Sequence, residues 1–405
     1  MTLEDIVTGR VGWGYFYRHN LSVFKNLQYL SLTHLNDDLH QWGHQIVEIL
    51  LNSPTLKGLD ISISAIGLYR HRPGNTFLQD ENENFFENLC DDYEEAGGQP
   101  LHLRSLRCGQ AIYPTSRWWL AKLTDPEFLE EIDICNLGVQ LRYTDLTMLY
   151  SNDHFHYADF DECHIDLHAF TPTHCPNLRY FSAAEYQDDV HSFLGAISEH
   201  KPFTRRLIVR FERLRVYDTA RMLRPDPDHP GLPIQLRMFL GLQLDRFDPE
   251  RYRDESEKFS VEQILDDLVS STADSLEGLL VNVAEGKRVT RSTARALFDF
   301  QGLDAVESAL PRLPRLTQLA VNTDRIDEDG EGFVLPGRVL RAAKRLALAG
   351  PSLVYVNIYK QFWHILRTKK GTVQLVEMEE REWKDVELFY HVVWKPSRYS
   401  WNGGV

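Results

Sequence analysis

The chain has 405 residues, and 59 Asp and Glu against 44 Lys and Arg give a formal net charge of −15. With 43% hydrophobic and 25% charged residues it has the composition of a soluble globular protein, and no stretch approaches the roughly 18 consecutive apolar residues of a membrane span. The acidic balance disfavours nucleic acid as a partner, because phosphate binding depends on clustered Lys and Arg, and it favours a basic protein partner.

The N-terminal residues and the cysteines indicate the compartment. Met1–Arg10 carries Glu4 and Asp5 and has neither the basic start nor the apolar run of a secretory signal. The five cysteines include no C-x-x-C pair, so neither a disulfide framework nor a zinc ribbon is expected. We therefore expect free thiols in a cytoplasmic or nuclear protein that does not bind membranes.

A short phrase with apolar residues at its first, fourth and sixth positions recurs along the chain. Because alternate side chains of a strand point to opposite faces, positions 4 and 6 face the core while positions 3, 5 and 7 face solvent. The clear copies are Leu27-Leu30-Leu32, Leu56-Leu59-Ile61, Leu103-Leu106-Cys108, Leu129-Ile132-Ile134, Leu276-Leu279-Val281, Leu316-Leu319-Val321 and Leu353-Val356-Ile358. Weaker copies are Phe155-Ala158-Phe160, Leu178-Phe181-Ala183 and Thr204-Leu207-Val209, with a degenerate copy at Leu236 and Phe239.

Helices are expected between the strand phrases, because one such strand cannot bury itself and the chain has to return along the outside. The first covers residues 37–51, where apolar residues recur at helical spacing and Pro54 follows. The others are expected at Ser116–Leu123, Asp188–Ser198, Ser260–Ser271, Thr290–Ala309 and Gly337–Ala349. Strand, helix and strand at this period predict an α/β leucine-rich-repeat solenoid, curved, with parallel strands on its concave face and helices on its convex face.

Two insertions interrupt the repeats, at about 69–99 and 221–258. In the first we expect a loop and then an acidic helix at Asp80–Glu95 whose Phe85, Phe86 and Leu89 pack on the solenoid. The second contains the proline-rich Arg221–Pro233 and the charged Asp245–Lys258, both predicted to be loops.

The ends of the chain are expected to close the solenoid. Trp363–Leu375 alternates around a Lys-Gly turn and predicts a C-terminal β-hairpin. The hairpin, at Trp363–Met378, and the following Trp383–Trp394 are expected to cap the last repeats, with Trp363, Ile365, Val373 and Leu375 packed on them. The expected organisation is a partial repeat or N-terminal cap at 1–26, the irregular repeats at 27–358 and the cap at 359–405.

The strand phrase, the C-P-N-L-R-Y-F segment at Cys175–Phe181 and the irregular spacings resemble the leucine-rich-repeat part of fungal F-box/leucine-rich-repeat proteins, over roughly residues 21–358. The resemblance implies a protein-interaction domain and, in the relatives, attachment to a ubiquitin-ligase adaptor through an N-terminal F-box. Met1–Asn26 contains no Leu-Pro-x-Glu phrase of an F-box. Adaptor docking is therefore implied by the resemblance alone.

Histidines and cysteines crowd into residues 154–175 and suggest a metal site, since imidazole and thiolate are the usual zinc ligands. The group comprises His154, His156, Cys163, His164, His168, His174 and Cys175. Their spacing fits strand and return segments better than a ligand set, so a structural role is favoured over a metal-dependent enzyme. His40 and His44 have no H-E-x-x-H glutamate between them.

No nucleophile motif or phosphate-binding loop occurs either: the sequence has no G-x-S-x-G and no Walker phrase. We therefore expect no catalytic residue, no metal ligand, no cofactor and no enzymatic activity.

The predicted outward positions of four consecutive phrases place acidic, aromatic and basic side chains together on the concave face. Neighbouring strands lie about 4.8 Å apart, so carboxylates on successive strands would form one acidic patch, with tyrosines beside it and two arginines further along. The predicted partner-binding residues are Glu131, Asp133, Tyr157, Asp159, Asp161, Tyr180, Arg206 and Arg210. Chance clustering in an acidic protein is the alternative explanation.

The sequence thus predicts a non-enzymatic protein-interaction module of the leucine-rich-repeat type that binds a basic protein segment. The alternative is the substrate-recognition subunit of an F-box (cullin-RING) ubiquitin ligase whose F-box is missing or upstream. A metal-dependent enzyme using residues 154–175 is the distant third.

Overall fold

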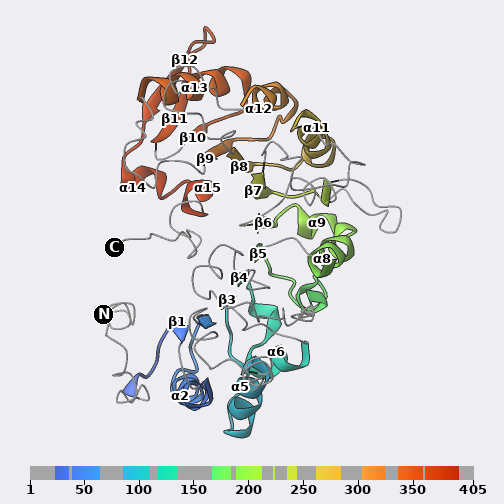
Figure 1. Ribbon diagram of the computed structural model, residues 1–405, viewed down its shortest axis with the longest axis vertical. Helices are drawn as coiled ribbons and strands as arrows, with labels where there is room; N and C mark the ends of the chain where they lie inside the picture. Colours follow the sequence, from blue (N-terminus) through green and yellow to red (C-terminus); the bar gives the residue numbers. More distant parts are fainter. Residues whose placement is uncertain are drawn as a thin grey trace, which may run out of the picture. The chain divides into compact units, whose positions relative to one another are not determined.

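The computed structural model describes residues 23–35, 39–63, 85–109, 117–135, 167–183, 188–211, 222–223, 235–243, 261–283, 303–323, 336–358 and 361–391. The chain divides into two compact units, Met1–Phe193 and Leu194–Val405. Strands and helices alternate along both units (Figure 1). Within the described ranges, no helix is long and apolar enough to cross a membrane.

The first unit contains five strands that pair in parallel and in sequence order. They are β1 (Tyr29–Leu35), β2 (Gly58–Ile63), β3 (Ser105–Gly109), β4 (Glu131–Cys135) and β5 (Tyr180–Ala183). Position 4 of each phrase forms one row across the sheet, Leu30, Leu59, Leu106, Ile132 and Phe181, and position 6 forms another, Leu32, Ile61, Cys108, Ile134 and Ala183. Every residue of both rows is at most 3% exposed, so the predicted core positions of this unit are confirmed.

Helices return the chain between these strands (Figure 1). They are α2 (Leu39–Leu51), α5 (Phe85–Glu95), α6 (Arg117–Leu123), the 3-10 segments η3 (Pro126–Phe128) and η4 (Leu167–Phe170), and α8 (Asp188–Ser198), in which the boundary between the units falls. α2 packs against α5, and α5 against α6. Phe85, Phe86 and Leu89 are buried, which confirms the acidic helix predicted in the first insertion.

The second unit contains seven strands, again paired in sequence order. They are β6 (Ile208–Phe211), β7 (Met238–Gln243), β8 (Gly278–Val283), β9 (Gln318–Thr323), β10 (Tyr355–Ile358), β11 (Gln361–Arg367) and β12 (Val373–Glu377). β6 to β10 are parallel, whereas β11 pairs antiparallel with β10 and β12 antiparallel with β11. The predicted inward residues Leu279, Val281, Leu319, Val321, Val356 and Ile358 are at most 1% exposed.

The helices of the second unit are α9 (Lys201–Thr204), α11 (Val261–Thr272), α12 (Leu303–Ala309), the 3-10 segment η5 (Leu310–Arg312), α13 (Pro336–Ala349), α14 (Glu380–Trp383) and α15 (Glu387–Phe389). α11 packs against α12, α12 against α13, and α13 against β10. α14 and α15 follow the hairpin, and α15 contacts β8 and β9. Figure 1 shows α15 on the other side of these strands from α11.

One backbone arrangement repeats at the start of successive strands. The carbonyl before a strand accepts hydrogen bonds from two consecutive N–H groups of the next repeat. In the first unit, for example, the Glu130 carbonyl accepts from Arg179 and Tyr180 at 2.8 and 3.1 Å, and in the second the Glu277 carbonyl accepts from Thr317 and Gln318 at 3.0 Å each. These bonds fix the register, so equivalent positions of the phrase fall side by side.

The register shifts once in the second unit, within β7, between Leu240 and Leu242. Gly241 lies at this bulge with φ +106°, and a Cβ there would be 2.1 Å from the Phe211 carbonyl oxygen. Only glycine fits this backbone, because it tolerates positive φ and has no side chain to clash.

These strands and helices confirm the predicted α/β repeat class: a mostly parallel sheet alternating with helices and ending in antiparallel strands. β7 is formed by the degenerate copy and lies within the predicted insertion 221–258. α12 forms the last part of the predicted helix 290–309, and residues 290–302 lie outside the described residues. Residues 1–22 and, in the insertions, residues 69–84, 221, 224–234 and 244–258 lie outside the described residues. The hairpin is confirmed. Trp363 and Ile365 are buried as predicted, whereas Val373 and Leu375 are only half-buried because β12 is the last strand of the sheet.

The structure corrects the expectation that a strand at 155–160 lies between β4 and β5. That phrase lies outside the described residues, but β4 pairs directly with β5, Glu131 beside Tyr180 and Asp133 beside Ser182. No strand from 155–160 therefore lies between them. A count of the phrases shows which segments could form strands. A segment joins the sheet only if the chain that returns after it also covers the core.

Candidate interaction face

Positions 3 and 5 of the phrase form two further rows in the first unit, on the opposite face from the buried leucines. The position-3 row is Tyr29, Gly58, Ser105, Glu131 and Tyr180, and the position-5 row is Ser31, Asp60, Arg107, Asp133 and Ser182. We call the first four members of each row the polar strand face. It carries the carboxylates of Asp60, Glu131 and Asp133 against the single guanidinium of Arg107.

The position-5 row is held by side-chain contacts between neighbouring strands. The Ser31 hydroxyl donates to Asp60 Oδ2 at 3.1 Å, and Arg107 Nε lies 2.9 Å from Asp133 Oδ2. The Arg107 and Asp133 side chains are 19% and 14% exposed, so this ion pair is shielded from solvent more than an ordinary surface pair. Opposite charges thus face each other across β3 and β4.

The position-3 row has an aromatic side chain at one end and an acid near the other. Tyr29 is 68% exposed, and its ring lies over Gly58, where an added Cβ would come within 2.5 Å of the ring. Ser105 and Glu131 follow on the next two strands, both half-buried. The Tyr29 ring therefore covers Gly58, and Ser105 is the small side chain between this ring and Glu131.

Charged side chains just before β3, β4 and β5 form ion pairs with one another beside this face. Glu130 is contacted by Arg179 Nη2 at 3.0 Å and by Arg104 Nε at 3.9 Å, so one carboxylate lies between two guanidinium groups. Both arginine side chains are 62% exposed. These contacts align neighbouring repeats but add little stability, because solvent screens exposed pairs.

The structure changes the predicted binding site in several respects. Glu131 and Asp133 do lie on one face, but Asp133 is paired with Arg107 and so is no unpaired acid. Tyr180 is only 2% exposed and is therefore not an exposed aromatic anchor. Tyr157, Asp159 and Asp161 lie outside the described residues, and the direct pairing of β4 with β5 removes the strand that was to place them between Glu131 and Tyr180.

The two predicted arginines belong to the second unit. Arg206 precedes β6 and is exposed, because this strand begins two residues later than the phrase at Thr204 predicts. Arg210 lies within β6, and its Nη1 donates to the His391 carbonyl at 3.0 Å. It therefore contacts the chain's own C-terminal part.

The face of the second unit equivalent to the polar strand face is mostly apolar, with Arg210, Gln318 and Asn357 among its polar residues, and it is covered. Its buried residues are Ile208, Met238, Leu240, Leu280, Ala320, Asn357 and Phe362. Residues 383–391, which we call the covering segment, contact this face. Phe389 lies edge-on to Tyr355 and Phe362 with ring centroids 6.3 and 5.0 Å away, and Trp383 stacks on Phe362 at 4.9 Å.

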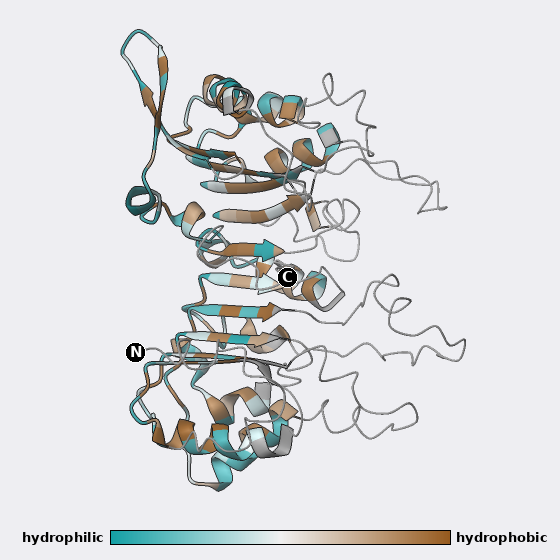
Figure 2. Cartoon of the chain, turned by 60° about the vertical axis from the view of Figure 1, so that its left-hand side comes forward, coloured by the Kyte–Doolittle hydropathy of each residue, from teal (hydrophilic) through white to brown (hydrophobic). Residues whose placement is uncertain are grey.

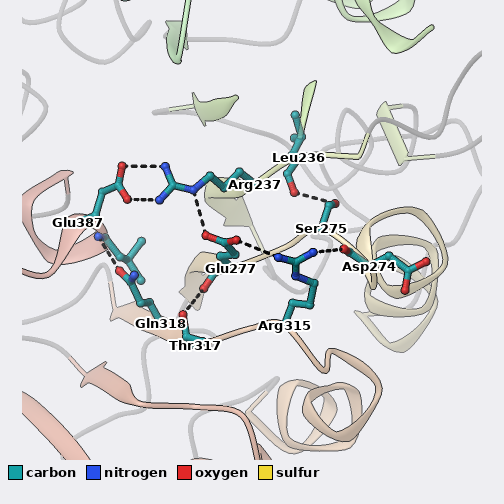
Figure 3. Close-up of polar contacts among 10 residues, drawn as sticks. Leu236, Arg237, Asp274, Ser275, Glu277, Arg315, Thr317, Gln318 and Glu387 are labelled. Carbon is teal, nitrogen blue, oxygen red and sulfur yellow. Dashed lines mark hydrogen bonds and ion pairs between the residues drawn. The ribbon is translucent and has the colours of Figure 1, made fainter. Parts of the chain in front are cut away.

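Three polar contacts fix the covering segment, and Figure 3 shows the centre of this network. Arg237 donates to both Glu387 oxygens, with Nη1 3.1 Å from Oε1, while its Nε donates to Glu277 at 3.0 Å. The Leu388 N–H donates to Gln318 Oε1 at 2.8 Å, and the third contact is the bond from Arg210 to His391. Burial alone would lower the pKa of Arg237, but the hydrogen bonds to Glu277 and Glu387 outweigh it, and the pKa is raised.

The described histidines and cysteines form no metal cluster. Among the residues the structure describes, no group of three His, Cys, Asp or Glu side chains could hold a metal ion. Cys175 is buried with its Sγ 3.5 Å from the Ala169 carbonyl oxygen, and burial raises the pKa of this thiol to about 12. Such a thiol stays protonated at neutral pH and is a poor nucleophile and ligand. His154, His156, Cys163 and His164 lie outside the described residues.

The sequence was compared with models of protein families and with the curated proteins, and neither comparison finds a match. Sequence reasoning missed Tyr29, Asp60 and Arg107, although they occupy positions 3 and 5 of clear phrase copies. Applying the same phase to the first three copies would have found them.

Proposed function

We propose that this protein is a non-enzymatic, leucine-rich-repeat-like interaction module whose polar strand face binds an extended segment of a protein partner. The partner segment is basic, because the face carries three carboxylates and one guanidinium. An aromatic or apolar residue of the partner packs on the exposed ring of Tyr29, which covers Gly58.

The observation that carries this proposal is the covering segment of the second unit. There the same face of the same kind of repeat holds a peptide segment, through one bidentate ion pair, one bond from a peptide N–H to a side-chain amide, and one bond from an arginine to a peptide carbonyl. Parallel repeats thus present side chains at a spacing that suits an extended or turning peptide. The first unit presents Asp60, Glu131 and Arg107 in the corresponding rows.

Charge and aromatic contact play separate parts in such binding. Carboxylates steer a basic segment toward the face and lose influence as salt rises, since the Debye length is about 8 Å at physiological ionic strength. An exposed aromatic anchor supplies contact area at a low cost in side-chain entropy and commonly dominates interface energetics. Affinity is therefore expected to depend on both Glu131 and Tyr29.

The test is selection of 12-residue peptides from a random display library on the full-length chain, followed by fluorescence anisotropy with the selected peptides. We expect enrichment of Lys and Arg, with affinity falling between about 0.05 and about 0.3 M salt. The variant Glu131→Lys with Asp60→Asn should weaken binding at least about tenfold, and Tyr29→Ala by a similar factor at unchanged salt dependence.

A matched control reverses acids on the helices of the same unit. Glu48 on α2 and Glu95 on α5 are exposed and lie away from the rows of the polar strand face. Glu48→Lys with Glu95→Lys adds at least as much positive charge and should leave affinity within about twofold, because screened charges at a distance contribute little. Selected peptides without excess basic residues, or equal losses in both double variants, would contradict the proposal.

A further inference from the structure

The free edge of β12 carries unpaired main-chain groups. The Met378 N–H donates to the Phe362 carbonyl and the Thr368 N–H to the Thr372 carbonyl, so the pairs 362/378 and 368/372 are hydrogen-bonded. In an antiparallel ladder every second pair exchanges these bonds. The N–H and C=O groups of Val373, Leu375 and Glu377 therefore point away from β11.

The other side of β11 supports this assignment. The Ile365 N–H donates to the Val354 carbonyl at 2.7 Å, so odd-numbered residues of β11 bond to β10 and even-numbered residues bond to β12. β12 is the last strand in the order, and no described strand pairs with its outer edge. Three donors and three acceptors are available there in one straight run.

This edge lacks two of the usual protections against strand pairing, proline and a β-bulge, although β12 is short and α13 contacts it. Natural edge strands carry prolines, bulges or inward charges. β12 has the sequence V-Q-L-V-E with regular pairing to β11 and neither proline nor bulge. Val373 and Leu375 are half-buried, Val376 is 39% exposed, and Figure 2 shows the hairpin extending away from the strands of its unit.

The charges at the two ends of the hairpin are opposite. Lys369 and Lys370 lie exposed at the turn, and neither forms an ion pair with a described residue. Glu377, Glu379 and Glu380 lie exposed at the base, where Arg381 Nε is 3.0 Å from Glu379 Oε2 and Lys384 Nζ is 3.2 Å from Glu380 Oε1, and the acids still outnumber the basic residues there. Two such hairpins in antiparallel arrangement bring the lysine end of each to the acidic end of the other, so the edge is complementary to itself in charge.

We propose that β12 pairs antiparallel with β12 of a second copy of this chain, about a twofold axis at Leu375. A twofold axis perpendicular to the sheet keeps side chains on their own face, so residues of equal parity pair. Leu375 then bonds with Leu375 of the partner subunit, and Val373 with Glu377 of the partner subunit. Every outward N–H and C=O of Val373, Leu375 and Glu377 is satisfied, and Lys370 faces Glu380 of the partner subunit.

The experiment measures the mass of the full-length chain by sedimentation equilibrium over a range of concentrations. We expect a monomer–dimer equilibrium. Leu375→Pro removes an outward donor without removing a β11–β12 bond and should weaken the dimer at least tenfold. Leu348→Lys, at an exposed position of α13, is the surface control and should leave the equilibrium unchanged.

A charge-reversal pair keeps the test independent of proline strain. Lys369→Glu with Lys370→Glu, and separately Glu377→Lys with Glu380→Lys, should each give monomers, because like charges then meet at both ends. An equimolar mixture of the two variants should restore a dimer, since each lysine end again meets an acidic end. A wild-type chain that stays monomeric at about 100 μM, or a dimer that persists in both charge variants, would overturn the proposal; so would binding of an unrelated strand peptide without self-association.

Discussion

The Arg237 guanidinium donates two hydrogen bonds to the carboxylate of Glu387, 150 residues further along the chain. The pair ties the covering segment to the start of β7, and Glu277 contacts the same guanidinium from the next repeat. The contact between Arg237 and Glu277, which joins neighbouring repeats, thus also anchors the covering segment through Glu387. The strand face of the second unit is part of its core for this reason.

Breaking this anchor should loosen the covering segment. In a double-mutant cycle of Arg237→Met and Glu387→Gln, we expect a coupling of about 1 kcal/mol, since the pair is bidentate but its side chains are 30% and 37% exposed. The measurements are denaturant unfolding and hydrogen exchange of the Leu388 amide, which should become faster in both single variants. Arg381→Met, at an 81% exposed side chain, is the control, and an equal effect there would contradict the assignment.

Replacing Gly241 should destabilise the second unit strongly. Gly241→Ala adds a Cβ 2.1 Å from the Phe211 carbonyl oxygen on a backbone with φ +106°, and we expect a loss of more than about 2 kcal/mol in the free energy of unfolding. Gly97 separates conformational strain from the clash, because its φ is +84° and nothing lies within 4 Å of an added Cβ. Gly97→Ala should cost about 1 kcal/mol of unfolding free energy. Equal losses at the two sites would show that the backbone shifts to remove the clash of the Gly241 Cβ with the Phe211 carbonyl oxygen.

A buried acid in β4 should unfold the repeats around it. Ile132 is 1% exposed, so Ile132→Asp places a carboxylate in the core and should cost about 4 kcal/mol or more. Ile132→Val should cost about 1 kcal/mol, and Glu131→Gln, on the opposite face, less than about 0.5 kcal/mol. Thermal melting of the three variants checks the order, and an unchanged melt of Ile132→Asp would be incompatible with this packing.

Stability should fall at alkaline pH through the buried thiols. Burial, with smaller contributions from Asp60 and Asp133, raises the pKa of Cys108 well above its ordinary value of 9.0. The stabilising contribution is fully present below pH 9, because the thiol is then protonated in both the folded and the unfolded chain. Above pH 9 only the unfolded chain ionises, and stability falls by about 1.4 kcal/mol per pH unit for one thiol.

The measurement is the unfolding free energy from pH 8 to pH 10.5 for the wild type and for Cys108→Ala. The variant will be less stable at pH 8 because it leaves a cavity, so the comparison concerns the slope with pH. Its slope above pH 9 should be shallower than that of the wild type. Identical slopes would mean that Cys108 ionises freely in the folded chain.

The strands were predictable where the signal is local. Leu30, Leu59 and Ile132 alternate with polar residues, and a period of two places them on one face of a strand whatever surrounds it. The acidic helix α5 was predictable for the same reason, because Phe85, Phe86 and Leu89 lie on one side of a helix. The predicted site was only partly right: Glu131 and Asp133 share a face, but the pairing of Asp133 with Arg107 depends on a register that one phrase does not contain.

The sequence by itself determined the repeating α/β class, the inward rows and the C-terminal hairpin, because alternation and helical spacing are properties of short segments. Tertiary structure decided which strands are neighbours, as with β4 beside β5, and which outward positions are buried, as with Tyr180. It also decided that residues 383–391 cover the strand face of the second unit, through Glu387 on Arg237 and Phe389 on Phe362. These contacts join residues far apart in the chain, and their free energy depends on burial and on paired charges that exist only after the repeats have stacked.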